Sequence, residues 1–115
     1  AYELTCRDWS SDVCSSDRRE LAATGITLGF LEEIQLGRDY VRMPNGSVLV
    51  IYSDGIVERM NQAGDMFGVE RLRDFIIAHQ TLEAQALLEL LFETVIEFGH
   101  GAAWEDDATL VVIKH

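Results

Sequence analysis

Two places in the sequence put carboxylates at the ends of strand-like segments. Asp54 and Gly55 directly follow the apolar run "VLVIYS". An acidic trio, Glu105-Asp106-Asp107, directly precedes the β-branched run "ATLVVIK". Carboxylate oxygen is the ligand that hard divalent cations prefer, so both places are candidates for metal binding. The alternative for Asp54-Gly55 is a hairpin turn, because this pair suits the positive φ angles of tight turns.

The two acidic places meet only if the strands beside them are neighbours. In an antiparallel pair the end of one strand lies beside the start of the other, so Asp54 and Asp106 would lie at one rim of a sheet. Carboxylates brought together repel each other unless a cation or a proton lies between them. Successive residues of a strand point to opposite faces, so only one of Asp106 and Asp107 should face Asp54. Convergence therefore favours a metal site.

The strands that must position these acids are predicted from β-branched runs and turn residues. "DYVRM" and "SVLVIYS" indicate two strands around a tight turn at Pro44-Asn45-Gly46. The second of them is apolar nearly throughout, which is typical of a strand buried on both faces. "ATLVVIK" predicts a closing strand, and "ATGITLGFLEE" predicts a short extended piece between glycines.

Two helices are expected between these strands. "GVERLRDFIIAH" has apolar residues at helical spacing, and Thr81 is a good N-cap for a second helix that glycines end near residue 99. One face of the second helix is apolar: Ala84, Leu87, Leu88, Leu91, Val95 and Phe98. Another carries Glu89, Glu93 and Glu97, which we interpret as a solvated face. The predicted class is therefore α+β.

Composition limits the domain count and the partners. A chain of 115 residues that is 48% hydrophobic is one small domain or part of a larger one. Its 20 acidic and 9 basic residues give a net charge of -11, so nucleic acid and anionic membranes would be repelled. No apolar run approaches the roughly 20 residues of a membrane span, and no signal-peptide pattern opens the chain. We expect a soluble, cytoplasmic protein.

The opening stretch differs in composition from the rest. Residues 1–17 are rich in serine and aspartate, and the spacing of Cys6 and Cys14 matches no zinc or redox motif. The string "RDWSSDVCSSD" resembles a translated adaptor remnant, so we interpret residues 1–17 as a non-native leader outside the fold. A natural disordered or linker segment is the alternative. Residues 18–115 then form the folded part.

Two segments together resemble a known family. "GSVLVIYSDGIVERMNQAGDMFGVERL" and "EDDATLVVIK" are similar to the C-terminal half of the PPM-type, metal-dependent serine phosphatase domain, in the bacterial branch of RsbU and the sporulation stage II phosphatase E. The most specific parts are Asp-Gly after a buried strand, the N-x-x-G-x-x-F-G spacing from Asn61 to Gly68, and Asp-Asp-x-Thr at the last strand. The resemblance implies part of a layered αββα sandwich with an antiparallel sheet and two helices packed on one face.

The resemblance also implies chemistry and roles. Two Mn²⁺ or Mg²⁺ ions would activate a water that attacks phosphoserine or phosphothreonine in a protein substrate, which in this branch is commonly an anti-anti-sigma factor of bacterial stress signalling. Asp54 and Asp106 resemble metal ligands. Asp107 would orient a ligand, although an exposed acid at the strand entry is the alternative. Gly55 would allow a tight backbone turn at the site.

One departure from the family pattern bears on activity. A further aspartate-glycine pair that bridges both metals lies in the N-terminal half of such domains, and nothing in residues 1–30 resembles it. We therefore expect a truncated, weakly active or inactive phosphatase domain. The alternative is a non-catalytic pseudophosphatase or interaction module with an acidic rim. The three histidines, His79, His100 and His115, are interpreted as structural or solvated residues rather than ligands.

Overall fold

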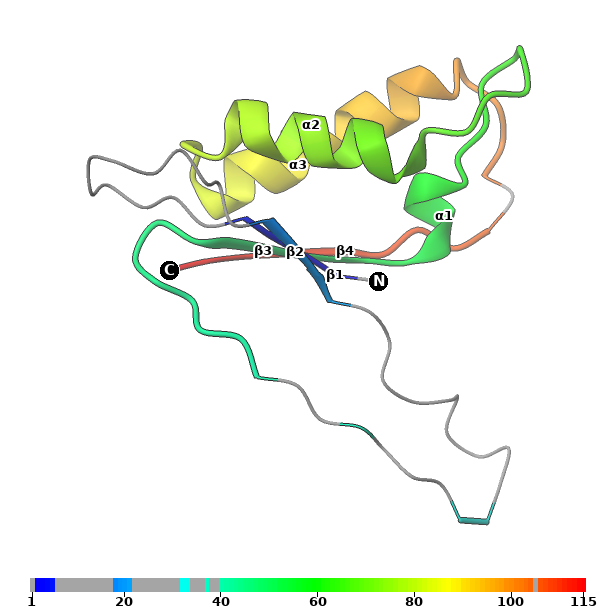
Figure 1. Ribbon diagram of the computed structural model, residues 1–115. Coiled ribbons are helices and arrows are strands. Elements are labelled where there is room, and N and C mark those ends of the chain that lie inside the picture. The colour runs from blue at the N-terminus through cyan, green and yellow to red at the C-terminus, as the bar shows by residue number, and fades with distance from the viewer. Residues whose placement is uncertain (1, 6–17, 22–31, 34–36, 38–39, 105) are drawn as a thin grey trace.

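The computed structural model describes residues 2–5, 18–21, 32, 33, 37, 40–104 and 106–115. Four strands form one antiparallel sheet in the order β2-β1-β3-β4, and two long helices, α2 and α3, lie on the same face of it (Figure 1). The predicted α+β class, with two helices on one face of an antiparallel sheet, is confirmed. The elements are β1 (Tyr2–Thr5), β2 (Arg18–Leu21), β3 (Val48–Tyr52), α1 (Asp54–Val57), α2 (Gly68–His79), α3 (Ala84–Phe98) and β4 (Leu110–Lys114).

The strands beside the two acidic places are β3 and β4. They run antiparallel, with Val48 opposite Lys114 and Tyr52 opposite Leu110, so the end of β3 lies beside the start of β4. The predicted pairing of "SVLVIYS" with "ATLVVIK" is confirmed. Alternate residues of β3, namely Val48, Val50 and Tyr52, are buried in the core, as the two-residue period of a strand requires.

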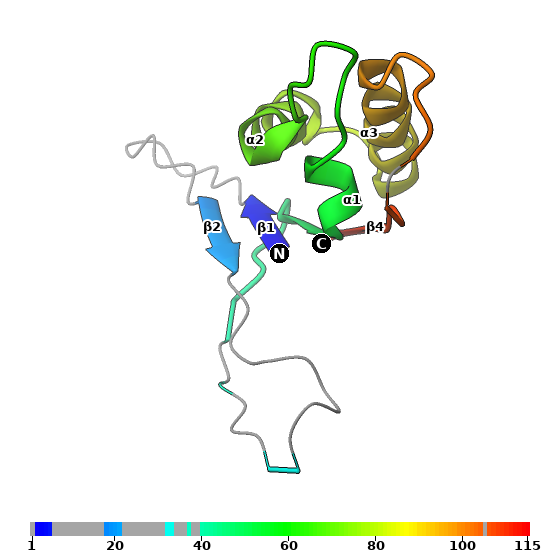
Figure 2. The ribbon, with the colours of Figure 1, turned by 90° about the vertical axis from the view of Figure 1, so that its right-hand side faces the viewer.

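The helices cover this sheet through the predicted apolar stripe. Leu87, Leu91 and Val95 of α3 are fully buried, whereas the row of glutamates on the same helix is exposed. From α2, Leu72 and Ile76 join the same core, which Leu110 and Val112 of β4 also contact. Figure 2 shows α2 and α3 lying next to each other above the strands. None of the described helices combines the length and apolar character needed to cross a lipid bilayer.

The face of the sheet turned away from the helices is also apolar. Val111 and Ile113 of β4 are 41% and 43% exposed. They lie opposite Ile51 and Leu49 of β3, which are half-buried. A strand buried on both faces was expected for β3, but only the face of Val48, Val50 and Tyr52 is buried, and Leu49 and Ile51 are half-buried.

The prediction of a strand at "DYVRM" is wrong over Tyr40–Met43, because these residues have no strand conformation. Both edges of β3 are taken, one by β1 and the other by β4, so no backbone groups of β3 remain for a further partner. The predicted tight turn is present. The Ser47 N–H donates to the Pro44 carbonyl (3.0 Å), and Gly46 has a φ of 86°.

The start of α3 also differs from the prediction. The N-cap is Glu83 rather than Thr81, because residues 80–82 form a turn that joins the helices. In this turn the Leu82 N–H donates to the His79 carbonyl (3.0 Å). The Lys114 ammonium of β4 donates to the Gln80 carbonyl (2.9 Å) and to that of Leu82. The turn thereby ties the helical layer to the sheet.

The opening segment differs in part from the expected leader. Tyr2–Thr5 form β1, which pairs with β3 and with β2. The physical reason is that β3 has a second edge of backbone N–H and C=O groups, and a neighbouring strand satisfies them. Residues 6–17, with both cysteines, lie outside the described residues, as do residues 23–31 of the extended piece expected at residues 23–33.

Candidate metal centre

Asp54 stands where the buried strand β3 gives way to a short helix. Ser53 is the N-cap, and Asp54 is the first residue of α1, a single helical turn. Its side chain is exposed. The hairpin considered for Asp54-Gly55 is wrong, because the chain continues into α1 instead of returning as a strand. A carboxylate at a helix N-terminus is favoured by the peptide dipoles, and this position leaves it at the rim of the sheet.

Ser53 joins the exit of β3 to the entry of β4. Its backbone N–H donates to the Thr109 carbonyl (3.0 Å), and its Oγ accepts from the Thr109 N–H (2.9 Å). The same Oγ donates to the Asp107 carbonyl (3.0 Å). These bonds hold the segment that carries Asp106 and Asp107 beside the residue that precedes Asp54. The two predicted acidic places therefore lie at the same end of one strand pair (Figure 1).

Gly55 contributes by its lack of a side chain. A Cβ there would lie 2.9 Å from the Asp107 carbonyl carbon, closer still to its oxygen, and 3.3 Å from the Asp106 carbonyl oxygen. We expected Gly55 to permit a tight turn, yet its φ is not positive. The close approach of α1 to the Asp106-Asp107 backbone, rather than an unusual φ, is what requires glycine here.

The acids at the start of β4 are both exposed. The Asp106 Oδ1 accepts from the Asp107 backbone N–H (2.8 Å), which fixes the turn that leads into the strand. Together with Asp54 they offer oxygen donors, the type that Mn²⁺ and Mg²⁺ take. Across residues 40–104 and 106–115, and in the shorter described pieces, no group of three His, Cys, Asp or Glu side chains could hold a metal. By donor type Asp54 and Asp106 could supply part of a ligand set, and the described residues do not complete one.

A buried arginine beside this rim was not singled out from the sequence. Arg59 is 5% exposed and donates to the Ala103 carbonyl (2.7 Å) and to the Ala102 carbonyl (2.5 Å). Its guanidinium also lies over the Trp104 ring, 4.5 Å from the centroid. Nothing in the local string "VERM" distinguishes this arginine from a solvated one, because its partners are more than 40 residues away in the sequence.

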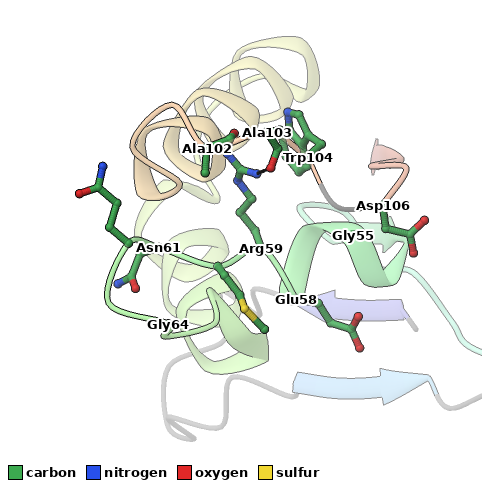
Figure 3. Close-up of a pocket in the computed structure, with 11 residues that line it drawn as sticks. Gly55, Glu58, Arg59, Asn61, Gly64, Ala102, Ala103, Trp104 and Asp106 are labelled. Atoms are coloured by element: carbon green, nitrogen blue, oxygen red, sulfur yellow. Dashed lines mark hydrogen bonds between the residues drawn. The ribbon is translucent and has the colours of Figure 1, made fainter.

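A pocket of about 210 Å³ opens between this arginine, the following loop and the start of β4 (Figure 3). Glu58, Asn61, Trp104 and Asp106 are among its lining residues. In Figure 3 the carboxylates of Glu58 and Asp106 point away from the Arg59 guanidinium. The pocket therefore adjoins the acidic rim without having a carboxylate paired to its buried cation among the residues drawn.

The structure explains the N-x-x-G-x-x-F-G motif as a loop that leads into α2. The Asn61 Oδ1 accepts from the N–H groups of Ala63 and Asp65, both at 2.9 Å. Gly64 adopts a φ of 85° within this loop, and Phe67 is buried with its ring edge-on to Phe98, 5.4 Å away. Asn61 thus has a structural role in closing the loop.

His79 is held within the helical layer. Its Nδ1 lies 2.9 Å from the Phe75 carbonyl, and its ring stacks on that of Phe75 with 4.3 Å between centroids. Because a carbonyl only accepts, Nδ1 carries the proton in this contact. The contacts are those of a structural histidine at the end of α2.

Comparisons with known proteins show similarity in sequence and in fold. The family described as stage II sporulation protein E matches residues 12–115. Protein IcfG of Synechocystis sp. is 22% identical over 96 residues, which make up 84% of this chain and 15% of IcfG. The solved SiaA-PP2C domain of Pseudomonas aeruginosa superposes with a TM-score of 0.68 at 17% identity, covering 99% of this chain and 43% of the other. The chain thus spans less than half of either relative.

Proposed function

Because the chain belongs to the stage II sporulation protein E family, a family of PPM-type (PP2C) phosphatases, we propose that it is the C-terminal portion of a protein serine/threonine phosphatase domain. One observation carries this proposal. Asp54 and Asp106, 52 positions apart in the sequence, lie at the same end of the β3-β4 pair. The shared fold with the SiaA-PP2C domain supports it.

The proposed site takes two Mn²⁺ or Mg²⁺ ions in the complete domain, and Asp54 and Asp106 are two of the ligands. When bound, such ions activate water for attack on phosphorus and stabilise the charge on the phosphoryl group. Asp107 orients the ligand beside it. Ser53 and Gly55 keep the backbone of Asp106 and Asp107 against α1, which fixes the carboxylates before an ion arrives.

We propose further that residues 18–115 are part of a longer domain. Coverage of 43% of the SiaA-PP2C chain supports this, and so does the lack of a second aspartate-glycine pair in residues 1–30. The coding sequence upstream of Arg18 tests it directly. An Asp-Gly pair placed to bridge two ions there supports a complete two-metal site, and a sequence without one contradicts it.

The proposed substrate is a phosphorylated protein in a bacterial cytoplasm. The net charge of -11 disfavours nucleic acid and anionic membranes as partners. The family resemblance supports an anti-anti-sigma factor as the phosphoprotein, in sigma-factor or stress signalling. Phosphoserine or phosphothreonine in that partner would be the group hydrolysed.

The test is phosphopeptide hydrolysis by the product of the complete gene, with and without Mn²⁺. Asp54→Asn should remove most of the Mn²⁺-dependent activity because it weakens a metal ligand, while the melting temperature stays near that of the parent. Asp74→Asn is the matched control, since Asp74 is an exposed acid on α2. A parent protein that is inactive although its ligands are intact would contradict catalysis and support the non-catalytic interaction module.

A further inference from the structure

Arg59 connects two segments that are far apart in the sequence and adjoin the acidic rim. Arg59 follows the single-turn helix that begins at Asp54, with Glu58 between them. The residues whose carbonyls accept from Arg59, Ala102 and Ala103, lie shortly before Asp106 in the sequence. The two hydrogen bonds, at 2.5 and 2.7 Å, involve a charged donor and are therefore stronger than bonds between neutral groups. The arginine thus ties the chain that leaves Asp54 to the chain that arrives at Asp106 (Figure 3).

The guanidinium is enclosed on its other sides. Trp104 covers one face of it. Gly99 lies so close on another side that a Cβ there would collide with Nε, Cζ and one terminal nitrogen of Arg59. Nε is buried without a hydrogen-bond partner in the described part of the chain. Residues 102–104 supply the two carbonyls and the ring that contact the buried cation, so the arginine and this segment restrain each other.

Asp106 therefore lies between two anchoring points. On its C-terminal side Ser53 accepts from Thr109 and donates to Asp107. On its N-terminal side Arg59 holds Ala102 and Ala103. We propose that Arg59 is a positioning residue that fixes residues 99–104 and thereby holds the Asp106 carboxylate at the rim for metal binding. This inference rests on the proposed function, because it assumes that Asp106 is a ligand.

The effect should be measurable as metal affinity. A ligand that must be ordered on binding holds an ion less tightly than one already in place, and loss of a residue that orients a ligand typically costs roughly 10- to 100-fold in metal affinity. Arg59→Met keeps the apolar stem but removes the donors. Ala102 and Ala103 are exposed, so water can reach their released carbonyls and the fold should survive.

The chain offers a control with similar contacts in Arg71, whose side chain is exposed whereas that of Arg59 is buried. It also donates to two carbonyls, those of Met66 (2.7 Å) and Phe67 (3.0 Å), and lies over an aromatic ring, that of Phe98, at 5.1 Å. These contacts are with residues outside the segment 99–107, since Phe98 is the last residue of α3. Arg71→Met therefore removes a similar set of contacts without releasing Ala102 and Ala103.

The experiment is a Mn²⁺ titration by calorimetry of the complete protein, together with hydrogen exchange of residues 99–107. Arg59→Met should weaken Mn²⁺ binding roughly tenfold or more and speed exchange in this segment, and excess Mn²⁺ should restore the hydrolysis rate. Arg71→Met should leave all three unchanged. Arg59→Lys keeps the charge but not the planar guanidinium that reaches both carbonyls, so it should also weaken Mn²⁺ binding. It replaces Arg59→Met as the test variant if that variant does not fold.

Three outcomes separate this inference from the proposed function. Unchanged Mn²⁺ affinity in both Arg59 variants, with affinity lost in Asp106→Asn, would overturn the positioning role and leave the phosphatase proposal intact. Unchanged affinity in Asp106→Asn would overturn the assignment of the ligand itself. Equal losses in the Arg59 and Arg71 variants would show general destabilisation and also overturn the positioning role.

Discussion

Gly55 of α1 lies directly against the Asp107 carbonyl, so that no side chain fits between the short helix and the start of β4. The contact brings Gly55, the residue after Asp54, against the backbone of Asp106 and Asp107. The rim of the sheet is thus shaped by close backbone packing, to which the Ser53 hydrogen bonds add a second constraint.

Gly55→Ala should therefore disturb the rim more than a typical small substitution does. The added methyl group meets backbone atoms that cannot rotate away, and overpacking of this kind costs about 1 to 3 kcal/mol. The melting temperature of the complete protein and its rate of Mn²⁺-dependent hydrolysis should both fall. Gly64→Ala is the contrast. Its Cβ would meet nothing within 4 Å, but its φ of 85° is unfavourable for alanine, so stability should fall by about 1 to 2 kcal/mol with activity retained.

Asp106 and Asp107 should differ in their response to neutralisation. Asp106→Asn removes the charge of a proposed ligand and should abolish most Mn²⁺-dependent turnover. Asp107→Asn keeps the backbone carbonyl that Ser53 uses and should lower turnover about tenfold, as expected of a residue that orients a ligand. Phosphopeptide kinetics at several Mn²⁺ concentrations measure both. Full activity in Asp107→Asn would favour the alternative of an exposed acid at the strand entry.

The apolar stripe of α3 predicts a difference in stability between two neighbouring positions. Leu91 is fully buried, so Leu91→Ala should cost about 2 to 5 kcal/mol. Glu93 is exposed, so Glu93→Ala should change the free energy of unfolding by less than about 0.5 kcal/mol. Denaturant melts of the two variants test this. The reverse order would mean that α3 presents its other face to the sheet.

Asn61→Ala should loosen the loop before α2. The variant loses two hydrogen bonds to backbone N–H groups, each worth about 1 kcal/mol in net stability. Gln62, which is exposed in the same loop, supplies the control, and Gln62→Ala should be nearly neutral. Hydrogen exchange of the Ala63 and Asp65 amides reports the loss locally. Unchanged exchange at these amides would contradict the role given to Asn61.

The 115-residue chain by itself should bind Mn²⁺ weakly and hydrolyse an aryl phosphate poorly or not at all. Asp54 and Asp106 are two carboxylates, whereas two-metal catalysis needs both ions held about 3.5 to 4 Å apart. Calorimetry with Mn²⁺ and a chromogenic phosphate assay check this prediction. Strong turnover by the 115-residue chain would show that the proposed division of the domain is wrong.

Much of the fold follows from patterns within single segments. The two helices and the strands β3 and β4 were predicted because each has its own apolar period. The placement of Asp54 and Asp106 at one rim followed from pairing those strands. The strand expected at Tyr40–Met43 failed because strand formation depends on a free neighbouring edge, which is a property of the whole sheet. Tyr2–Thr5 fill one such edge although their composition gave no sign of it.

The contacts that shape the site were harder to foresee. Arg59 and Gly99 are 40 positions apart in the sequence, and neither carries a local signal for the other, yet they are packed together in the fold. Gly55 was expected to matter for its backbone freedom, but it matters for the space it leaves to Asp107. Such features depend on tertiary packing, which no window of sequence encodes.

The outward side of β4 sets how the isolated chain behaves in solution. Val111 and Ile113 are exposed on an edge strand of the described sheet, and exposed apolar edges promote pairing between molecules and aggregation. The net charge of -11 opposes this by mutual repulsion. Salt shortens the range of that repulsion to about 8 Å at physiological ionic strength. The colloidal stability of the isolated chain should therefore fall as ionic strength rises.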